Sequence, residues 1–179
     1  TVAGTATTSL AALTILGSNG NVGIGTTSPF AKLSVSAAPG DTNSTLFAIG
    51  SSTAASNATV FSIDRTGLTT LGNSAGTGDA TFQFASDNDA WSMGYNSTDK
   101  SFNIASSTSF SSNVAFTILK GGKTGISTTT PYYGLTVASS TGPQLSLSAG
   151  SGFAQWAFRN AGGNFYLATT TVAGDATTS

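Results

Sequence analysis

Two segments of the chain share one pattern, and this internal repeat constrains the fold more than any other feature of the sequence. They are GIGTTSPFAKLSV at 23–35 and GISTTTPYYGLTV at 125–137, and each follows a Thr-Ile-Leu tripeptide. In both copies a short apolar run leads into hydroxyl residues, a proline and an alternating apolar pair. In both copies an apolar residue follows a glycine by four positions, and the same spacing recurs after Gly67 and Gly163. The sequence therefore predicts one strand–turn–strand device that is used about four times.

A second repeat joins the two ends of the chain. Thr1–Ser9 reads TVAGTATTS and Thr171–Ser179 reads TVAGDATTS, so eight of nine positions agree. We interpret the chain as one long period of a tandem array followed by the first residues of the next period. Chance identity in a sequence rich in Thr and Ala is the alternative.

Alternation of apolar and polar residues over short runs predicts strands along nearly the whole chain. Clear examples are Val22/Ile24, Phe61/Ile63, Phe82/Phe84 and Leu145/Leu147. Gly, Asn, Ser and Pro separate these runs every ~8–12 residues. Residues 9–15 are compatible with either a short helix or an extended strand. We therefore predict an all-β chain of short strands and hairpins.

Three regions are predicted along this chain. Residues 1–72 form a thin β-repeat segment. Residues 73–116 hold Trp91, Tyr95 and several Phe residues, and they form a compact antiparallel β module. Residues 117–179 form a second thin β-repeat segment with a hairpin, and this segment ends at the start of the next tandem repeat.

The glycines of the first repeat copy raise the question of a phosphate-binding loop. Such a loop presents backbone amides where a strand turns into a helix. Here no Lys follows Gly25, and Pro29 occupies the place where a helix would begin. We interpret the motif as a corner between two strands, in which Thr and Ser hydroxyls satisfy turn amides. Gly23 and Gly25 are expected to let another backbone approach closely.

Composition excludes several classes of function. Only 7% of the residues are charged, all seven acids are Asp, and Cys, His and Glu are absent. Disulfides, the common zinc sites and a Ser-His-Asp triad are therefore excluded. A net charge of -1 gives no basic footprint for nucleic acid, and no apolar run approaches the ~18 residues of a membrane span. We predict no catalysis, no cofactor and no metal, and we interpret Asp87, Asn88, Asp89 and Asp99 as turn residues rather than calcium ligands.

Aromatic residues are the candidates for ligand contact. Aromatic faces near Asn and Asp can form platforms for sugars, and the candidates here are Trp91, Tyr95, Tyr132 and Tyr133. The alternative for each is that it fills a small core or an interface.

Self-association is the second prediction about contacts. A thin chain of short strands leaves edges and an apolar side unburied, and few Lys residues guard those edges. Intertwined identical chains would bury both. The predicted interchain core residues are Val22, Ile24, Leu33, Val35, Ile126, Leu135 and Val137. A monomeric β-solenoid or sandwich is the alternative.

The segment NGNVGIGTTSPFAKLSV resembles the repeat of bacteriophage tail fibres and of long fibrous bacterial surface proteins. AWSMGYNSTDKSFNIASS followed by FTILKGGKTGISTTTP is similar to the knob-then-shaft unit of the same proteins. The second copy departs from the pattern, because Ser127 replaces the second glycine and Tyr132 and Tyr133 follow the proline. We expect a wider or more exposed corner there.

This resemblance implies an elongated, intertwined homotrimer located outside the cell, on a cell surface or a virion. It implies a structural repeat segment of a fibre or filament, adhesive and non-catalytic, whose partners are its own copies and surface glycans. The alternative function is the carbohydrate-binding portion of a phage tail fibre.

Overall fold

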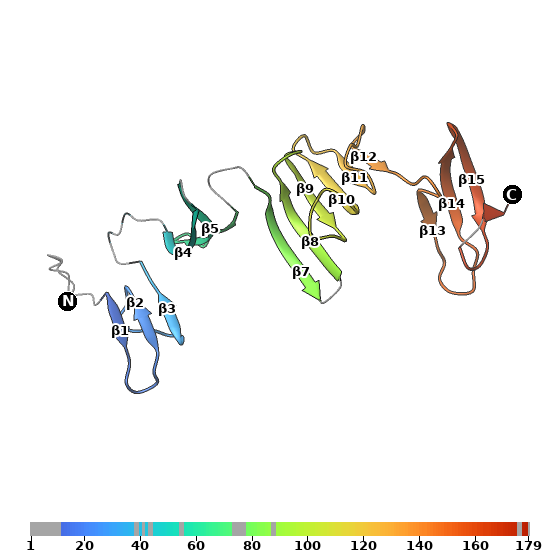
Figure 1. Cartoon of the computed structure of the whole chain (residues 1–179). Coiled ribbons are helices and arrows are strands. Elements are labelled where there is room, and N and C mark those ends of the chain that lie inside the picture. Colours follow the sequence, from blue (N-terminus) through green and yellow to red (C-terminus); the bar gives the residue numbers. More distant parts are fainter. Residues whose placement is uncertain are drawn as a thin grey trace. The chain divides into compact units, whose positions relative to one another are not determined.

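A computed structural model of the chain describes residues 12–37, 40, 42, 45–53, 56–72, 78–86, 89–174 and 177–178. All regular structure in these ranges is β-strand, and no helix occurs among them, which confirms the all-β prediction. The chain divides into two compact units, residues 1–78 and 79–179. Within the described ranges the first unit holds two three-stranded sheets, and the second holds a six-stranded and a four-stranded sheet (Figure 1). The three-region organisation of the sequence stays a prediction.

Most of the strands are short, as the sequence predicts. Those of the first unit are β1 (Leu13–Ile15), β2 (Val22–Ile24), β3 (Leu33–Val35), β4 (Thr45–Thr53), β5 (Ser56–Asp64) and β6 (Thr69–Leu71). Those of the six-stranded sheet are β7 (Ala80–Ser86), β8 (Asp89–Asn96), β9 (Ser101–Ala105), β10 (Val114–Leu119), β11 (Thr124–Ile126) and β12 (Leu135–Val137). Those of the last sheet are β13 (Leu145–Leu147), β14 (Trp156–Ala161), β15 (Asn164–Thr170) and β16 (Thr177–Thr178).

The first repeat copy folds as a hairpin followed by a parallel strand. β1 and β2 are antiparallel with Thr14 opposite Gly23, and β2 and β3 are parallel with Gly23 opposite Ser34. Residues 25–32 connect the parallel strands, fewer than the roughly a dozen residues that such a connection usually needs. Hydroxyls hold this crossover loop: the Ser28 amide donates to Thr26 Oγ1 at 3.1 Å, and the Ala31 amide donates to Ser34 Oγ at 3.1 Å.

The second repeat copy has the same structure. β10 and β11 are antiparallel with Thr117 opposite Gly125, and β11 and β12 are parallel with Gly125 opposite Thr136. In its crossover loop, residues 127–134, the Thr130 amide donates to Thr128 Oγ1 at 3.2 Å. The Tyr133 amide donates to Thr136 Oγ1 at 3.4 Å. The repeat seen in the sequence is thus a structural repeat down to its side-chain hydrogen bonds.

The hairpin of this unit occurs a third time without the crossover. β5 and β6 pair through a turn in which the Gly67 amide donates to the Asp64 carbonyl at 3.1 Å. The Gly122 amide makes the equivalent bond to the Leu119 carbonyl at 2.8 Å in the second repeat copy. Gly163 lies in a different turn, because Gly162 and Gly163 alone connect β14 and β15 and both have positive φ. Such a two-residue connection is a type I′ turn.

The glycines of the repeat are explained by close approach within the chain itself. A Cβ on Gly23 would lie 2.6 Å from the Thr26 carbonyl oxygen. A Cβ on Gly125 would collide with the carbonyl oxygen of Thr128, its counterpart. The backbone that approaches each of these glycines is therefore the crossover loop of the same repeat copy. The close backbone approach expected from the sequence occurs within one chain and does not require a second chain.

Residue 25 and its counterpart Ser127 both adopt the left-handed conformation. Their φ angles are 71° and 56°. Gly25 has no room for a side chain, because a Cβ there would collide with the Ser36 carbonyl oxygen. Ser127 carries a side chain at the same place in the second copy, so this corner leaves more space, in line with the wider corner that the sequence suggests.

The six-stranded sheet has the strand order β12-β11-β10-β9-β8-β7. β7 to β10 form an antiparallel meander, and β10 also begins the second repeat copy. The boundary predicted between residues 116 and 117 therefore falls inside a strand. Of the ambiguous segment 9–15, Leu13–Ile15 is strand, and residues 9–11 lie outside the described ranges.

Candidate interaction surface

One face of the six-stranded sheet consists almost entirely of large apolar side chains. Residues paired across neighbouring strands project to the same face of a sheet, so the register defines rows across it. One row is apolar on all six strands: Phe82, Met93, Ile104, Phe116, Ile126 and Val137. A neighbouring row on the same face contains Ala80, Tyr95, Phe102, Ile118, Thr124 and Leu135. Phe84 and Trp91 pair on this face as well, on the opposite flank of the first row. We call these residues the apolar face.

The apolar face carries no charge and is largely open to solvent in the single chain. Phe84 is 58% exposed, Trp91 47% and Leu135 61%. Monomeric proteins rarely expose contiguous apolar patches larger than a few hundred Å² unless the patch binds something. The open apolar face is therefore a candidate contact surface.

The opposite face of the same sheet is small, polar and covered. One of its rows runs through Thr81, Gly94, Asn103, Thr117, Gly125 and Thr136. Asn103 and Thr117 are fully buried. Residues 106–113 bind to this side, because Ser92 Oγ donates to the Ser107 carbonyl at 2.7 Å. Phe110, in the same segment, is 4% exposed.

The ordinary relation between polarity and burial is therefore inverted in the single chain. Among the described residues the buried hydrophobic ones are Ala90, Ala105, Phe110 and Ala157, and most of these are small. In the same ranges twice as many polar residues are buried as hydrophobic ones: Asn21, Ser34, Ser92, Asn96, Ser101, Asn103, Thr117 and Thr170. Apart from Phe110, the large apolar side chains are partly or largely exposed, and an exposed side chain contributes little to the stability of an isolated chain.

The other three sheets also carry an open apolar row on one face. In the first sheet the rows Leu13–Ile24–Val35 and Ile15–Val22–Leu33 share one face, and the buried Ser34 lies on the other. In the second sheet Ile49, Phe61 and Leu71 form such a row. In the last sheet Leu145, Phe158 and Leu167 do the same, and the buried Ala157 lies on the opposite face.

The predicted site residues lie in three places: the first sheet, the apolar face and the second crossover loop. Val22, Ile24, Leu33 and Val35 share the open face of the first sheet. Ile126, Leu135 and Val137 lie on the apolar face, and so do Trp91 and Tyr95, which the sequence offered as a sugar platform. The sequence reasoning left out the remaining large members of this face, although their alternation was visible: Phe82, Phe84, Met93, Phe102, Ile104, Phe116 and Ile118.

Tyr132 and Tyr133 lie apart from the apolar face. Both belong to the second crossover loop and are 78% and 79% exposed. Phe30 occupies the place of Tyr132 in the first crossover loop and is also highly exposed. Both loops thus present an aromatic ring directly after their proline, and the second presents two.

Asp64 and Asp89 accept hydrogen bonds from residues that are close to them in the sequence. Asp64 Oδ1 accepts hydrogen bonds from Thr66 Oγ1 at 2.7 Å, the Thr66 amide at 2.8 Å and the Leu68 amide at 2.9 Å. The Thr66 side-chain hydrogen bond, followed by these backbone amides, lowers the pKa of this exposed carboxyl below its usual 3.8. Asp89 Oδ1 accepts from the Ala90 amide at 2.8 Å.

Metal-binding groups are sparse in the ranges that the structure covers. Asp99 Oδ2 accepts from Asn96 Nδ2 at 3.2 Å, and Asp87 and Asn88 lie outside the described residues. No group of three or more His, Cys, Asp or Glu residues forms among those described. These same residues include no helix long and apolar enough to cross a membrane.

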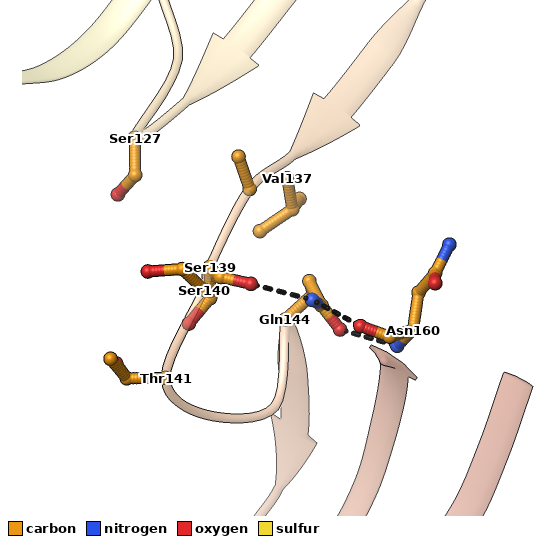
Figure 2. A pocket seen from close by; sticks show the side chains of 8 residues that line it. Ser127, Val137, Ser139, Ser140, Thr141, Gln144 and Asn160 are labelled. Atoms are coloured by element: carbon orange, nitrogen blue, oxygen red, sulfur yellow. Dashed lines mark hydrogen bonds between the residues drawn. The ribbon is translucent and has the colours of Figure 1, made fainter. Parts of the chain in front are cut away.

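A hollow of about 690 Å³ lies where the six-stranded sheet leads into the last sheet (Figure 2). Its polar lining residues are Ser127, Ser139, Ser140, Thr141, Gln144 and Asn160. The Gln144 side chain donates to the carbonyls of Ser139 at 3.0 Å and Asn160 at 3.2 Å, and it accepts from the Asn160 amide at 2.7 Å. Its amide group is thus used to tie the connection to β14. The lining supplies hydroxyls and amides but no titratable group, so it offers hydrogen bonding and no acid–base chemistry.

No protein-family model matches the chain, and a search of curated proteins finds no significant relative.

Proposed function

We propose that the chain is a structural segment of an extracellular fibre or filament, built from three identical chains, adhesive and non-catalytic. The observation that carries this proposal is the open apolar face of the six-stranded sheet, whose other face is already covered. The resemblance of the repeat motif to those of tail fibres and fibrous surface proteins supports the fibre and the number of chains.

Copies of the same chain are the partners that fit this face best. The face is uncharged, so identical copies meet without repulsion, and burying it would supply the hydrophobic core that one chain lacks. The sheet also has two edge strands, β7 and β12. Closed association of three sheets can protect such edges from further pairing. With 7% charged residues the chain has little else to prevent uncontrolled association.

Sedimentation equilibrium tests this proposal directly. We expect a mass of about 53 kDa, three times the chain mass of 17.7 kDa. A monomer in dilute solution would overturn the proposal, because the apolar face would then be stable in water. A two-chain mass would retain the role of the face and refute the trimer.

A second candidate function rests on the two exposed tyrosines. Tyr132 and Tyr133 lie outside the apolar face, so the association of copies through that face leaves them available. Paired aromatic rings on a loop can stack against sugars, which would fit the carbohydrate-binding portion of a phage tail fibre. A glycan array probed with the native chain and with Tyr132→Ala tests this function. Absence of binding to any glycan, or equal binding by both proteins, would exclude it.

A further inference from the structure

We propose that a groove beside β10 binds an uncharged saccharide through Ser and Thr hydroxyls. The inference rests on the second candidate function, for which it names a binding site. The groove has a volume of about 640 Å³, within the range of about 300–1,000 Å³ that is usual for small-molecule sites. No residue of its lining is charged. We call it the hydroxyl groove, after six of its lining residues: Ser106, Ser111, Ser112, Ser127, Thr128 and Thr129.

Both walls of the hydroxyl groove belong to the side of the sheet that is opposite to the apolar face. One wall is the segment 106–113, which Ser92 ties to the small polar face and in which Phe110 is buried. The other wall is the beginning of the second crossover loop, where the Thr128 carbonyl lies close to Gly125 on the same face. Association of copies through the apolar face therefore does not cover these walls.

Much of the hydrogen-bonding capacity of the groove is unused. Thr128 Oγ1 accepts from the Thr130 amide and keeps its own hydrogen to donate. Several side chains of the lining make no hydrogen bond to another described residue: Ser106, Ser112, Asn113, Ser127 and Thr129. Hydroxyls both donate and accept, as the hydroxyls of a sugar do. Because the lining carries no charge, the groove suits an uncharged ligand of this chemistry.

Two lining residues have a backbone conformation that residues other than glycine rarely adopt. The φ angle is 53° for Asn113 and 56° for Ser127. Asn is often tolerated in this left-handed region, whereas Ser is less common there. The first repeat copy has Gly25 at the place of Ser127, so the second copy gains a hydroxyl at the cost of backbone strain. Residues under such strain concentrate at binding sites.

Ser127 also lines the hollow shown in Figure 2, together with Ser139, Ser140 and Thr141. It is therefore shared by two recesses that are both rich in hydroxyls. A ligand of several sugar rings can contact both recesses with Ser127 between them.

The exposed tyrosines of the same loop are within reach of such a ligand. Tyr132 follows Thr129 by three residues, so their Cα atoms are at most about 11 Å apart. Sugars have apolar C–H faces as well as hydroxyls, and an aromatic ring offers a flat apolar surface to those faces. The hydroxyl groove and the Tyr132 ring thus supply the two kinds of contact that a saccharide uses.

Titration of the full chain with trisaccharides tests the site. The neutral probes are maltotriose, cellotriose, mannotriose and N-acetylchitotriose, each added to tens of millimolar, and the charged comparison is sialyllactose. Binding is followed through the amide NMR signals of the protein. We expect at least one neutral trisaccharide to shift the amides of Asn113, Ser127 and Thr129, and sialyllactose to bind no more tightly.

Ser127→Gly is the main variant, because it removes the hydroxyl and introduces the residue that the first repeat copy has at this place. Thr129→Val removes a second hydroxyl with little change of shape. Thr130→Val is the matched control: it makes the same change one residue further on, at an exposed residue outside the lining. We expect the first two variants each to raise the Kd about threefold to tenfold, as for the loss of one hydrogen bond, and Thr130→Val to leave it unchanged.

The possible outcomes separate the groove from the broader function. Native affinity in both Ser127→Gly and Thr129→Val overturns the groove, and if Tyr132→Ala abolishes that binding, the second candidate function stands without it. No shift with any neutral trisaccharide refutes both. Tighter binding of sialyllactose than of every neutral probe overturns the uncharged ligand. The mass in sedimentation equilibrium decides the three-chain proposal independently of all these results.

Discussion

Trp91→Ala is the substitution that most directly tests the role of the apolar face. A Trp side chain can bury up to about 250 Å², and the 47% of Trp91 that is exposed in one chain leaves about 120 Å² to be covered by other copies. At about 25 cal/mol per Å² the full burial of this area contributes about 3 kcal/mol per chain. Three chains then lose about 9 kcal/mol of assembly free energy, which is an upper limit because it assumes complete coverage.

The assay is sedimentation equilibrium over a wide concentration series, with circular dichroism to verify that the β-structure is retained. A tenfold change in the dissociation constant corresponds to 1.4 kcal/mol. Because three chains form one trimer, the concentration at which half of the chains are trimeric varies with the square root of that constant. A loss of about 9 kcal/mol therefore raises this concentration by about 10³-fold. A shift of this order separates the variant clearly from the native chain.

Tyr132→Ala is the matched control. It removes an aromatic ring that is 78% exposed, more than Trp91, but that lies in the crossover loop outside the apolar face. We expect its assembly to match that of the native chain. If Trp91→Ala assembles normally, or if Tyr132→Ala weakens assembly equally, the reasoning from the apolar face is wrong.

Two further predictions concern the fold of the repeat and its turns. Gly23→Ala should lower the free energy of unfolding by about 1–3 kcal/mol in urea titrations, because its Cβ would lie 2.6 Å from the Thr26 carbonyl oxygen; Gly17→Ala, whose Cβ would have no atom within 4 Å, should not destabilise. The pKa of Asp64 should be below 3.8 in an NMR titration and rise toward that value in Thr66→Val, which removes the main hydrogen bond. Since the folded pKa is the lower one, this carboxylate stabilises its turn above about pH 3.8 and stops doing so as the pH falls through the folded pKa; an Asp64 pKa at or above 3.8 in the native chain would contradict this.

Local patterns in the sequence predict the strands well. Val22 and Ile24 alternate with glycines, and they lie on a strand with the expected two-residue period. The match between 23–35 and 125–137 also extends to the structure, because both copies need the same glycine and the same hydroxyls to close one crossover loop.

The pairing of strands and the burial of whole sheet faces could not be predicted from such local patterns. Parallel pairing of β2 with β3 could not be read from a connection of eight residues, since short connections usually indicate antiparallel neighbours. The covered face of the six-stranded sheet was missed for a different reason. Buried positions are normally sought among apolar residues, whereas Asn103 and Thr117 are buried here and Trp91 is not. From the sequence, Trp91 was compatible with a sugar platform and also with a core or interface residue, as which we interpreted it in preference.

The two repeat copies differ in length at one place, and this difference has a practical use. The turn of the first hairpin consists of residues 16–21, and the turn of the second consists of residues 119–123 and is one residue shorter. The two crossover loops, in contrast, both have eight residues. At the tips of these turns, Gly17 and Gly121 have no atom within 4 Å of the place that a Cβ would take. The hairpin tips are therefore the positions at which a peptide epitope, an affinity tag or a fluorophore can be inserted, and the crossover loops, whose length is fixed by two hydroxyl bridges, are the positions to leave intact.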